Sequence, residues 1–288
     1  MVKNLIKELL PNKKINYNFF QKFFSNYEDE FLKKYLDYIL PLCLENIKIN
    51  SQNFPKILDI GCGFAPMCLA AKIFRNLWSN GKKIEHEKLD YAYVGIDIRK
   101  DAIDYNQINY RKYPENFFLL HEADTKVDYI GDYAKFSNNA SNIHFTTLES
   151  NGQETDYKIP FVYKADIQWS MSMFTHITPT ALSNVVKFIF ETLSDEGVSF
   201  NTCHIIDPES LFLMKTGLSD RYLEYDFGTF MSYSDKNPLL NTAYKIHYIN
   251  QVYKNNGLKI INIIKGNWRN IKKRRNGIDQ DIIIAKKI

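Results

Sequence analysis

Two short motifs carry the residue types that can hold a nucleoside. Residues 56–66 read KILDIGCGFAP and residues 93–98 read YVGIDI. Gly61 and Gly63 let the backbone approach a ligand closely, because neither residue has a Cβ atom. Asp97 ends the second apolar run, where a carboxylate can accept hydrogen bonds from both hydroxyls of a ribose. Together the motifs predict a crevice that binds a nucleoside.

The elements that position these residues are a strand, a turn and a helix. Ile57, Leu58 and Ile60 form the apolar pattern of a buried strand that ends at Gly61. Pro66 suits the first turn of a helix, where its missing N–H costs nothing. Such a unit turns backbone N–H groups and the positive end of a helix toward the ligand.

Three families use a crevice of this kind. Dinucleotide-binding domains require Gly-x-Gly-x-x-Gly, but Pro66 stands at the third glycine position. Phosphate-loop enzymes require Gly-Lys-Ser/Thr, which is absent from the sequence. The remaining pattern, Asp-x-Gly-x-Gly with an acid closing the next strand, resembles the class I S-adenosylmethionine (SAM)-dependent methyltransferases.

This resemblance assigns roles to residues of the chain. It implies that Asp59 lies near the methionine amino group, that Asp97 holds the ribose and that Asp124 contacts the adenine amino group. The full set of cofactor-binding residues that it implies is Asp59, Gly61, Cys62, Gly63, Asp97, Ile98, Ala123, Asp124 and Ser170.

Further strand and helix patterns predict an α/β fold, namely the Rossmann-like, seven-stranded mixed sheet of the class I methyltransferases. Val185 to Leu193 has the pattern of an apolar helix, and Asp195-Glu196-Gly197 signals its end. The last two strands are expected to form an antiparallel hairpin. The strands predicted after the first two are residues 116–120, 166–171, 198–204, 258–264 and 281–285.

The chain divides into an N-terminal helical cap, residues 1–50, and a methyltransferase domain, residues 51–288. Two insertions are expected in the domain, at about residues 125–164 and 207–240. The first resembles a β-hairpin with an Asn-Gly turn. The second is rich in aromatic residues and leaves the sheet at the edge where ligands of doubly wound sheets bind. It is therefore expected to bind the acceptor, although its aromatic residues could equally pack against the core.

Methyl transfer to a hydroxyl benefits from a base, and histidine suits this role near neutral pH. His176 lies in SMSMFTHI, which resembles a segment of methyltransferases from bacterial polysaccharide gene clusters, and it is the leading candidate. The alternative is a structural histidine that binds the backbone. His204 ends a predicted strand, and Asp207 follows it. A His–Asp pair would orient the imidazole. Alternatively, Asp207 begins a helix.

Composition narrows the functional classes. The net charge of +4 allows an anionic substrate without requiring nucleic acid. No stretch is apolar enough to span a bilayer, and no secretory signal is visible, so a cytoplasmic location is expected. Four scattered cysteines fit no zinc spacing and are expected to be free thiols, and no metal site is expected. The basic residues between 269 and 275 indicate either a solvated turn or a phosphate clamp.

The resemblance favours a SAM-dependent O-methyltransferase that acts on a small polar acceptor. The acceptor expected first is a sugar, in nucleotide-linked form, for a bacterial capsule or surface polysaccharide. One alternative is a methyltransferase of small molecules or natural products. The other is an RNA-binding protein on a methyltransferase scaffold. Nucleic acid is a less favoured partner, because SMSMF stands where amino-methylating enzymes carry Asn/Asp-Pro-Pro-Tyr/Phe.

Overall fold

The structure of the chain is a computed structural model. It describes residues 38–39, 42–43, 45–47, 55–63, 68, 92–109, 116–120, 159–270, 272 and 278–288. Predicted site residues 123 and 124 and nearly all of the predicted insertion at 125–164 lie outside these ranges. The second strand of the expected hairpin was predicted at residues 155–162, but the described residues 159–164 form no strand.

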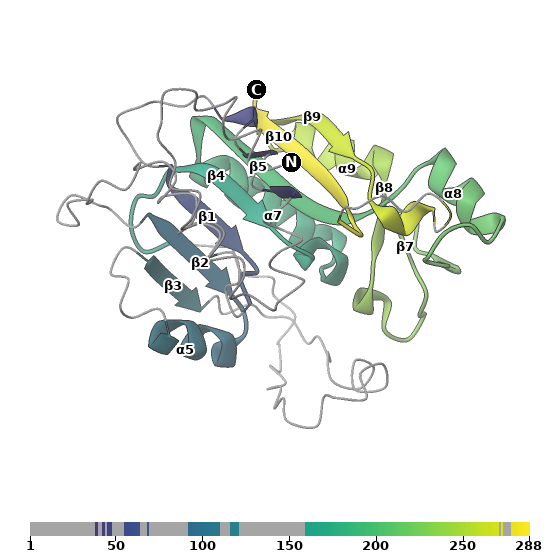
Figure 1. The fold of residues 1–288 in the computed structure, drawn as a ribbon, viewed down its shortest axis with the longest axis horizontal. Coiled ribbons are helices and arrows are strands. Elements are labelled where there is room, and N and C mark those ends of the chain that lie inside the picture. Colours follow the sequence, from purple (N-terminus) through teal and green to yellow (C-terminus); the bar gives the residue numbers. More distant parts are fainter. Residues whose placement is uncertain are drawn as a thin grey trace, which may run out of the picture.

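Five parallel strands form the half of the sheet that carries the two motifs (Figure 1). Their order is β3-β2-β1-β4-β5, so the chain reverses direction across the sheet after β3. Ile57 pairs with Tyr93 on one side and with Ile167 on the other, which places the ends of β1, β2 and β4 at one edge. The bounds are β1 Ile57–Ile60, β2 Tyr93–Asp97, β3 Asn116–Leu120, β4 Ala165–Ser170 and β5 Leu193–Ile206.

An antiparallel hairpin closes the chain. Strand β10 (Asp281–Lys287) lies between β5 and β9 (Leu258–Ile264) and runs antiparallel to both. The turn before β9 contains Gly257, whose φ of 78° favours glycine. The predicted fold class is confirmed, because the seven predicted strands form one Rossmann-like mixed sheet with the expected terminal hairpin.

Three further strands extend the sheet beyond the end of β5. His204 pairs with Ala243 and Ile206 pairs with Lys245, so β8 continues the sheet where β10 stops. The elements of this extension are α8 (Pro208–Lys215), β6 (Tyr225–Asp226), β7 (Phe230–Ser232), the 3-10 helix η3 (Pro238–Leu240) and β8 (Ala243–Lys245). All of them except β8 lie within residues 207–240, the region predicted as the aromatic insertion, and they lie at the end of the sheet opposite β3 (Figure 1).

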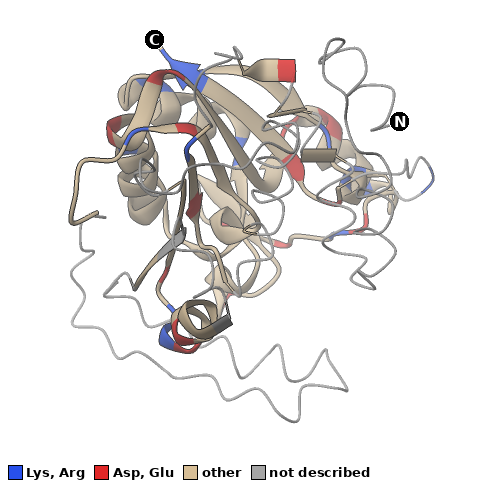
Figure 2. Cartoon of the chain, turned by 60° about the vertical axis from the view of Figure 1, so that its left-hand side comes forward, with Lys and Arg blue, Asp and Glu red and all other residues tan. Residues whose placement is uncertain are grey.

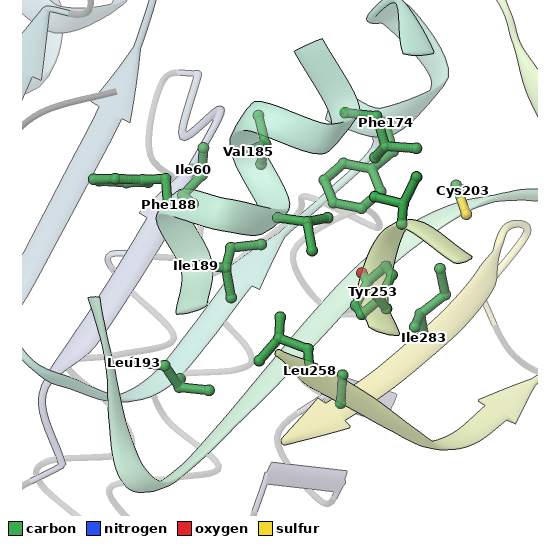
Figure 3. Close-up of a cluster of buried hydrophobic side chains, with 14 of the residues drawn as sticks. Ile60, Phe174, Val185, Phe188, Ile189, Leu193, Cys203, Tyr253, Leu258 and Ile283 are labelled. Carbon is green, nitrogen blue, oxygen red and sulfur yellow. The ribbon is translucent and has the colours of Figure 1, made fainter. Parts of the chain in front are cut away.

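Helices α7 and α9 bury an apolar cluster against one face of the sheet (Figure 3). Helix α7 (Pro179–Thr192) starts where Thr178 caps the backbone N–H of Ala181, several residues before the predicted start. Val185, Phe188 and Ile189 of α7 pack in the same cluster as Ile60 of β1. Each such fully buried side chain contributes roughly 1.5–3 kcal/mol by its removal from water. Helix α9 spans Ile246–Asn255.

Because side chains alternate along a strand, the other face carries a different set of residues. Asp59 is in register with Gly95 of β2 and with Trp169 of β4, so these three positions share that face. Helix α5 (Lys100–Asn109) follows β2 and contacts both β2 and β3.

Of the predicted N-terminal cap, only residues 38–39, 42–43 and 45–47 are described, and most are helical. The Asn46 carbonyl accepts a 3.0 Å hydrogen bond from Nζ of Lys286. Since β10 is antiparallel to β5, Lys286 lies toward the amino ends of the parallel strands. This contact is therefore at the edge opposite the glycine turn. Among the described residues, no helix has the length and hydropathy to cross a membrane. Basic and acidic positions are interspersed over the described chain (Figure 2).

Candidate functional site

The glycine turn is fastened to the end of strand β2. The backbone N–H groups of Gly61 and Cys62 donate to the Ile96 carbonyl at 2.8 and 3.0 Å. Gly61 and Gly63 have φ values of 75° and 52°, a region that costs residues with a Cβ roughly 1–2 kcal/mol. A Cβ on Gly63 would meet no atom of the described residues within 4 Å. The turn therefore places glycine backbone at the carboxyl ends of β1 and β2.

Asp97 connects the two predicted motifs directly. Its Oδ2 accepts a 2.7 Å hydrogen bond from the Gly63 N–H, and its Oδ1 accepts a 2.9 Å bond from the Arg99 N–H. Burial raises the pKa of this carboxyl, while the two backbone donors oppose that shift. A carboxylate oxygen has two lone pairs. Each oxygen can therefore accept one more bond, as ribose hydroxyls would require.

Asn106 of α5 supports the glycine turn, a role that the sequence does not reveal. Its Nδ2 donates to the Gly63 carbonyl at 2.7 Å, and its side chain is fully buried. Its Oδ1 has no hydrogen-bond partner among the described residues. Asparagine in a polar helical stretch normally faces solvent, so only the folded contact identifies it as a positioning residue of the glycine turn.

Asp59 forms a buried pair with a tyrosine on the neighbouring strand. Its Oδ2 accepts a 2.5 Å hydrogen bond from the Tyr93 hydroxyl. Burial raises the pKa of Asp59 to about 7, although the Tyr93 hydroxyl acts in the opposite direction. A Cβ on Gly95 would lie 3.1 Å from the Tyr93 ring and 3.0 Å from Cys62 Sγ, so the glycine makes room for both. Asp59 thus braces the strands beneath the turn, and its predicted contact with the methionine group stays a prediction.

The segment after β4 lies against the glycine turn. A Cβ on Gly61 would come within 2.9 Å of the Met173 Cβ, so Met173 covers this residue. Ser172 has a left-handed φ of 64°, and its N–H donates to Thr202 Oγ1 at 2.7 Å. Such strain in a residue other than glycine persists only where the surroundings enforce it. Ser170, the predicted cofactor contact on β4, is fully buried, and its Oγ has no partner in the described structure.

His176 ends the 3-10 helix η2 (Met173–His176). Its Nδ1 lies 3.2 Å from the Leu239 carbonyl, which can only accept, so Nδ1 carries the proton. Nε2 is then the basic nitrogen of the neutral ring. Burial lowers the pKa of His176 below its usual 6.5, and the backbone hydrogen bonds act against this. The ring is therefore neutral at physiological pH and can accept a proton.

His204 lies on β5 and is 1% exposed. Its Nδ1 is 2.9 Å from Asn241 Oδ1, and the ring packs edge-on against Trp268 at 5.1 Å between centroids. Burial, the nearby charge of Arg221 and other cationic neighbours lower the pKa of His204 to about 3. The predicted His204–Asp207 pair is wrong, because Asn241 occupies the place of the carboxylate.

Asp207 begins helix α8, which was the alternative expectation. Its Oδ1 accepts from the Ser210 N–H at 2.8 Å as a helix cap, and its Oδ2 accepts from Arg269 at 2.8 Å. These hydrogen bonds and the Arg269 charge hold the pKa of Asp207 below its ordinary value despite burial. Both oxygens serve the local structure, so Asp207 fastens the start of α8.

Arg269, the first residue of the basic cluster, is 3% exposed. Its guanidinium donates to both oxygens of the buried Asp281 and to the Ile205 carbonyl, in addition to Asp207. Neither a solvated turn nor a phosphate clamp describes this residue. It joins the ends of β5 and β10 to α8. Lys272 is exposed, and residues 273–275 lie outside the described part of the chain.

The structure brings most of the predicted residues to one edge of the sheet. Gly61, Gly63 and Asp97 form the turn, Ser170 and His176 follow β4, and His204 lies near the end of β5. Ile98 is half-buried next to Asp97, and Cys62 is buried inside the turn. No group of three or more metal-ligating side chains is found among the residues that the structure describes.

Comparisons with known proteins agree with the fold. No family model matches the chain. The PH0226 protein from Pyrococcus horikoshii is similar with a TM-score of 0.53 at 12% identity, over 93% of this chain and 99% of that one. At this identity the likeness shows a shared fold.

Several other similar structures are SAM-dependent methyltransferases. One from Clostridium acetobutylicum has a TM-score of 0.48 at 14% identity, over 94% of this chain and 98% of that one. Another is the magnesium protoporphyrin IX methyltransferase from Synechocystis PCC 6803, solved with bound S-adenosylhomocysteine (SAH). It has a TM-score of 0.47 at 11% identity, over 99% of this chain and 100% of that one.

Proposed function

We propose that this chain is a SAM-dependent methyltransferase that methylates a hydroxyl of a small polar acceptor. The observation that carries the proposal is the hydrogen bond that joins the glycine turn to Asp97 at the carboxyl ends of β1 and β2. In a doubly wound sheet, this is the crevice in which a nucleoside binds.

The described residues fit a nucleoside cofactor. No described atom lies within 4 Å of a Cβ placed on Gly63, and Asp97 retains lone pairs that can accept hydrogen bonds from ribose hydroxyls. Ser170 Oγ and Asn106 Oδ1 are buried polar atoms without described partners at the same edge. A buried polar group that lacks a hydrogen bond costs about 1–3 kcal/mol, which a bound polar ligand would recover.

When bound, SAM supplies an activated methyl group, and the chain must align the acceptor and remove its proton. We propose that Nε2 of His176 receives the proton of the acceptor hydroxyl. Nε2 is the basic nitrogen of the ring, because Nδ1 donates its proton to the Leu239 carbonyl. His176 lies three residues after Met173, the side chain that covers Gly61. With a pKa of about 3, His204 is too weak a base for this step near neutral pH.

A nucleotide-linked sugar for a bacterial capsule or surface polysaccharide is the acceptor that we propose first. It rests on the resemblance of SMSMFTHI to polysaccharide-cluster methyltransferases and on the extension α8–β8, which borders both histidines. A small natural product remains the alternative acceptor. The RNA-binding alternative is weakened, because Arg269 of the basic cluster is buried in ion pairs and cannot contact RNA phosphates. The proposal includes a cytoplasmic location, which suits four buried free cysteines.

Two measurements test this proposal. Calorimetric titration with SAM and SAH should show binding, and its absence would overturn the cofactor assignment. Incubation with SAM and a panel of UDP- and GDP-linked sugars, free sugars, phenols and RNA should then yield SAH and a methylated product by mass spectrometry. A product methylated at nitrogen or carbon would overturn the O-methyltransferase assignment, and a phenolic product would favour the natural-product alternative.

A further inference from the structure

The extension of the sheet holds a pair of buried polar atoms that the proposed chemistry does not use. Nε2 of His204 and Nε of Arg221 are both buried without a hydrogen-bond partner among the described residues. Pairs of this kind are costly, because each atom has lost water and gained nothing in return. Nε of Arg221 is a donor, whereas an unprotonated Nε2 of His204 is an acceptor, so the two atoms suit different groups of a ligand.

The tautomer of His204 is fixed. Asn241 Oδ1, 2.9 Å from Nδ1, is an acceptor when the amide faces the ring in this way, so Nδ1 carries the proton. Nε2 then offers only a lone pair. The strongly lowered pKa of His204 means that this lone pair remains unprotonated throughout the neutral range. His204 therefore accepts a hydrogen bond from a hydroxyl or an N–H group.

The residues that precede Arg221 are fastened to Trp268, the neighbour of His204. The Ser219 hydroxyl and the Asp220 N–H both donate to the Trp268 carbonyl, at 3.0 and 2.8 Å. The ring of Trp268 packs on His204. The two hydrogen bonds therefore place Ser219 and Asp220 against Trp268, which contacts His204. The charge of Arg221, the next residue, is close enough to lower the pKa of His204.

Among the described residues, the guanidinium of Arg221 makes one weak contact. A terminal nitrogen reaches Asp279 at 3.4 Å, a long contact for an ion pair, and the side chain is 37% exposed. Both groups are about equally exposed, so this pair contributes little to stability. Nε and the terminal nitrogens of arginine form a planar fork that matches phosphate or carboxylate oxygens.

We infer that His204 and Arg221 recognise the acceptor, with His204 Nε2 accepting a hydrogen bond from a hydroxyl and Arg221 binding an anionic group of the same molecule. The inference deepens the proposed function, because it makes the acceptor an anionic hydroxyl compound: a sugar that carries phosphate or carboxylate. It also gives His204 a binding role in place of a catalytic one.

The first test compares three ligands with the same ring configuration: glucose, glucose 1-phosphate and glucuronate. Calorimetric titration is carried out with and without SAH on the wild-type chain and on Arg221→Gln. The wild type should bind at least one anionic ligand about tenfold or more tightly than glucose, and Arg221→Gln should lose that preference. The relative affinities for glucose 1-phosphate and glucuronate show whether the site prefers a phosphate or a carboxylate. Lys215→Gln, which removes an exposed charge at the end of α8, should bind as the wild type does.

The second test observes His204 itself and does not depend on a variant that folds. The chain has six histidines, so long-range proton–nitrogen spectra of the imidazole rings can be resolved. Adding the preferred anionic ligand should move the Nε2 resonance of the His204 ring while its Nδ1 resonance stays in place. Equal binding of glucose and both anions, an unchanged preference in Arg221→Gln, or a static Nε2 resonance would each overturn the inference. SAH binding is read separately, so a chain that binds SAH without an anion preference refutes this inference and leaves the methyltransferase proposal standing.

Discussion

Asp97 and Gly63 are joined by a hydrogen bond of 2.7 Å from the glycine N–H to the carboxylate. The bond links the end of β2 to the turn that follows β1. One residue can thereby shape the turn and face a ribose at the same time. This coupling makes Asp97 the most informative position for testing cofactor binding.

Asp97→Asn should weaken SAH binding by about ten- to a hundredfold, since hydrogen bonds to a charged group contribute roughly 1.5–3 kcal/mol. The amide would also turn one donor toward a backbone N–H of Gly63 or Arg99, where the carboxylate accepts. Calorimetric titration with SAH measures the effect. Asp104→Asn is the matched control, because the contact that the described structure gives Asp104 is an exposed ion pair with Lys100. Equal losses in both variants would show that Asp97 has no special role.

The two glycines of the turn should tolerate alanine differently. Both have left-handed φ values, so each substitution costs roughly 1–2 kcal/mol of stability. Gly61→Ala must also displace Met173, whose Cβ lies 2.9 Å from the new methyl group, whereas the new methyl group of Gly63→Ala meets no described atom within 4 Å. Overpacking of this kind adds about 1–3 kcal/mol. Urea unfolding should therefore show the larger loss for Gly61→Ala, and a larger loss for Gly63→Ala would contradict the geometry of the turn.

The local signals in the sequence predict much of the sheet. The bounds of β3 and β9 agree with the predicted strands, and the glycine turn and Asp97 lie together as expected. These features depend on runs of apolar residues and on turn residues that are adjacent in the chain. The start of α7 was predicted too late, since the cap and proline at 178–179 precede its apolar stripe.

The rest depends on partners that are distant in the chain. Asn241 binds His204 across 37 positions, Asn106 reaches Gly63 across 43, and Arg269 is buried by Asp207 and Asp281. No local sequence pattern predicts such contacts, because polar residues of these types are usually exposed. The sequence placed candidate residues at the correct edge of the sheet, and the fold determined which of them remain available for chemistry.

His176→Asn should lower kcat by about 10²–10⁴-fold if the histidine is the base. Because the pKa of His176 lies below 6.5, the wild-type rate should be level through neutral pH and decline only when acid protonates the ring below that value. The residual activity of the variant should lack this acid limb. His247→Gln, at an exposed position of α9, serves as the control. A variant that retains full kcat with the same pH profile would remove His176 from the mechanism.

Asp59 and His204 should give the chain opposite responses to pH. His204 has a pKa of about 3 in the folded chain and 6.5 when unfolded, so the unfolded state binds more protons and stability rises with pH between these values. Asp59 has a folded pKa of about 7 and an unfolded value of 3.8, so the folded state binds more protons and stability falls with pH across that range. Each contribution is on the order of 4 kcal/mol over its full window.

Between pH 3.8 and 6.5 the two effects largely cancel in the wild-type chain. Asp59→Asn should therefore become more stable with rising pH relative to the wild type, by about 1.4 kcal/mol for each unit in this interval. His204→Gln should show the reverse trend. Urea unfolding at several pH values measures both slopes, and each slope is taken as the difference from the wild type so that other titrating groups cancel. If both variants have the slope of the wild type, the two buried groups keep their ordinary pKa values in the folded chain.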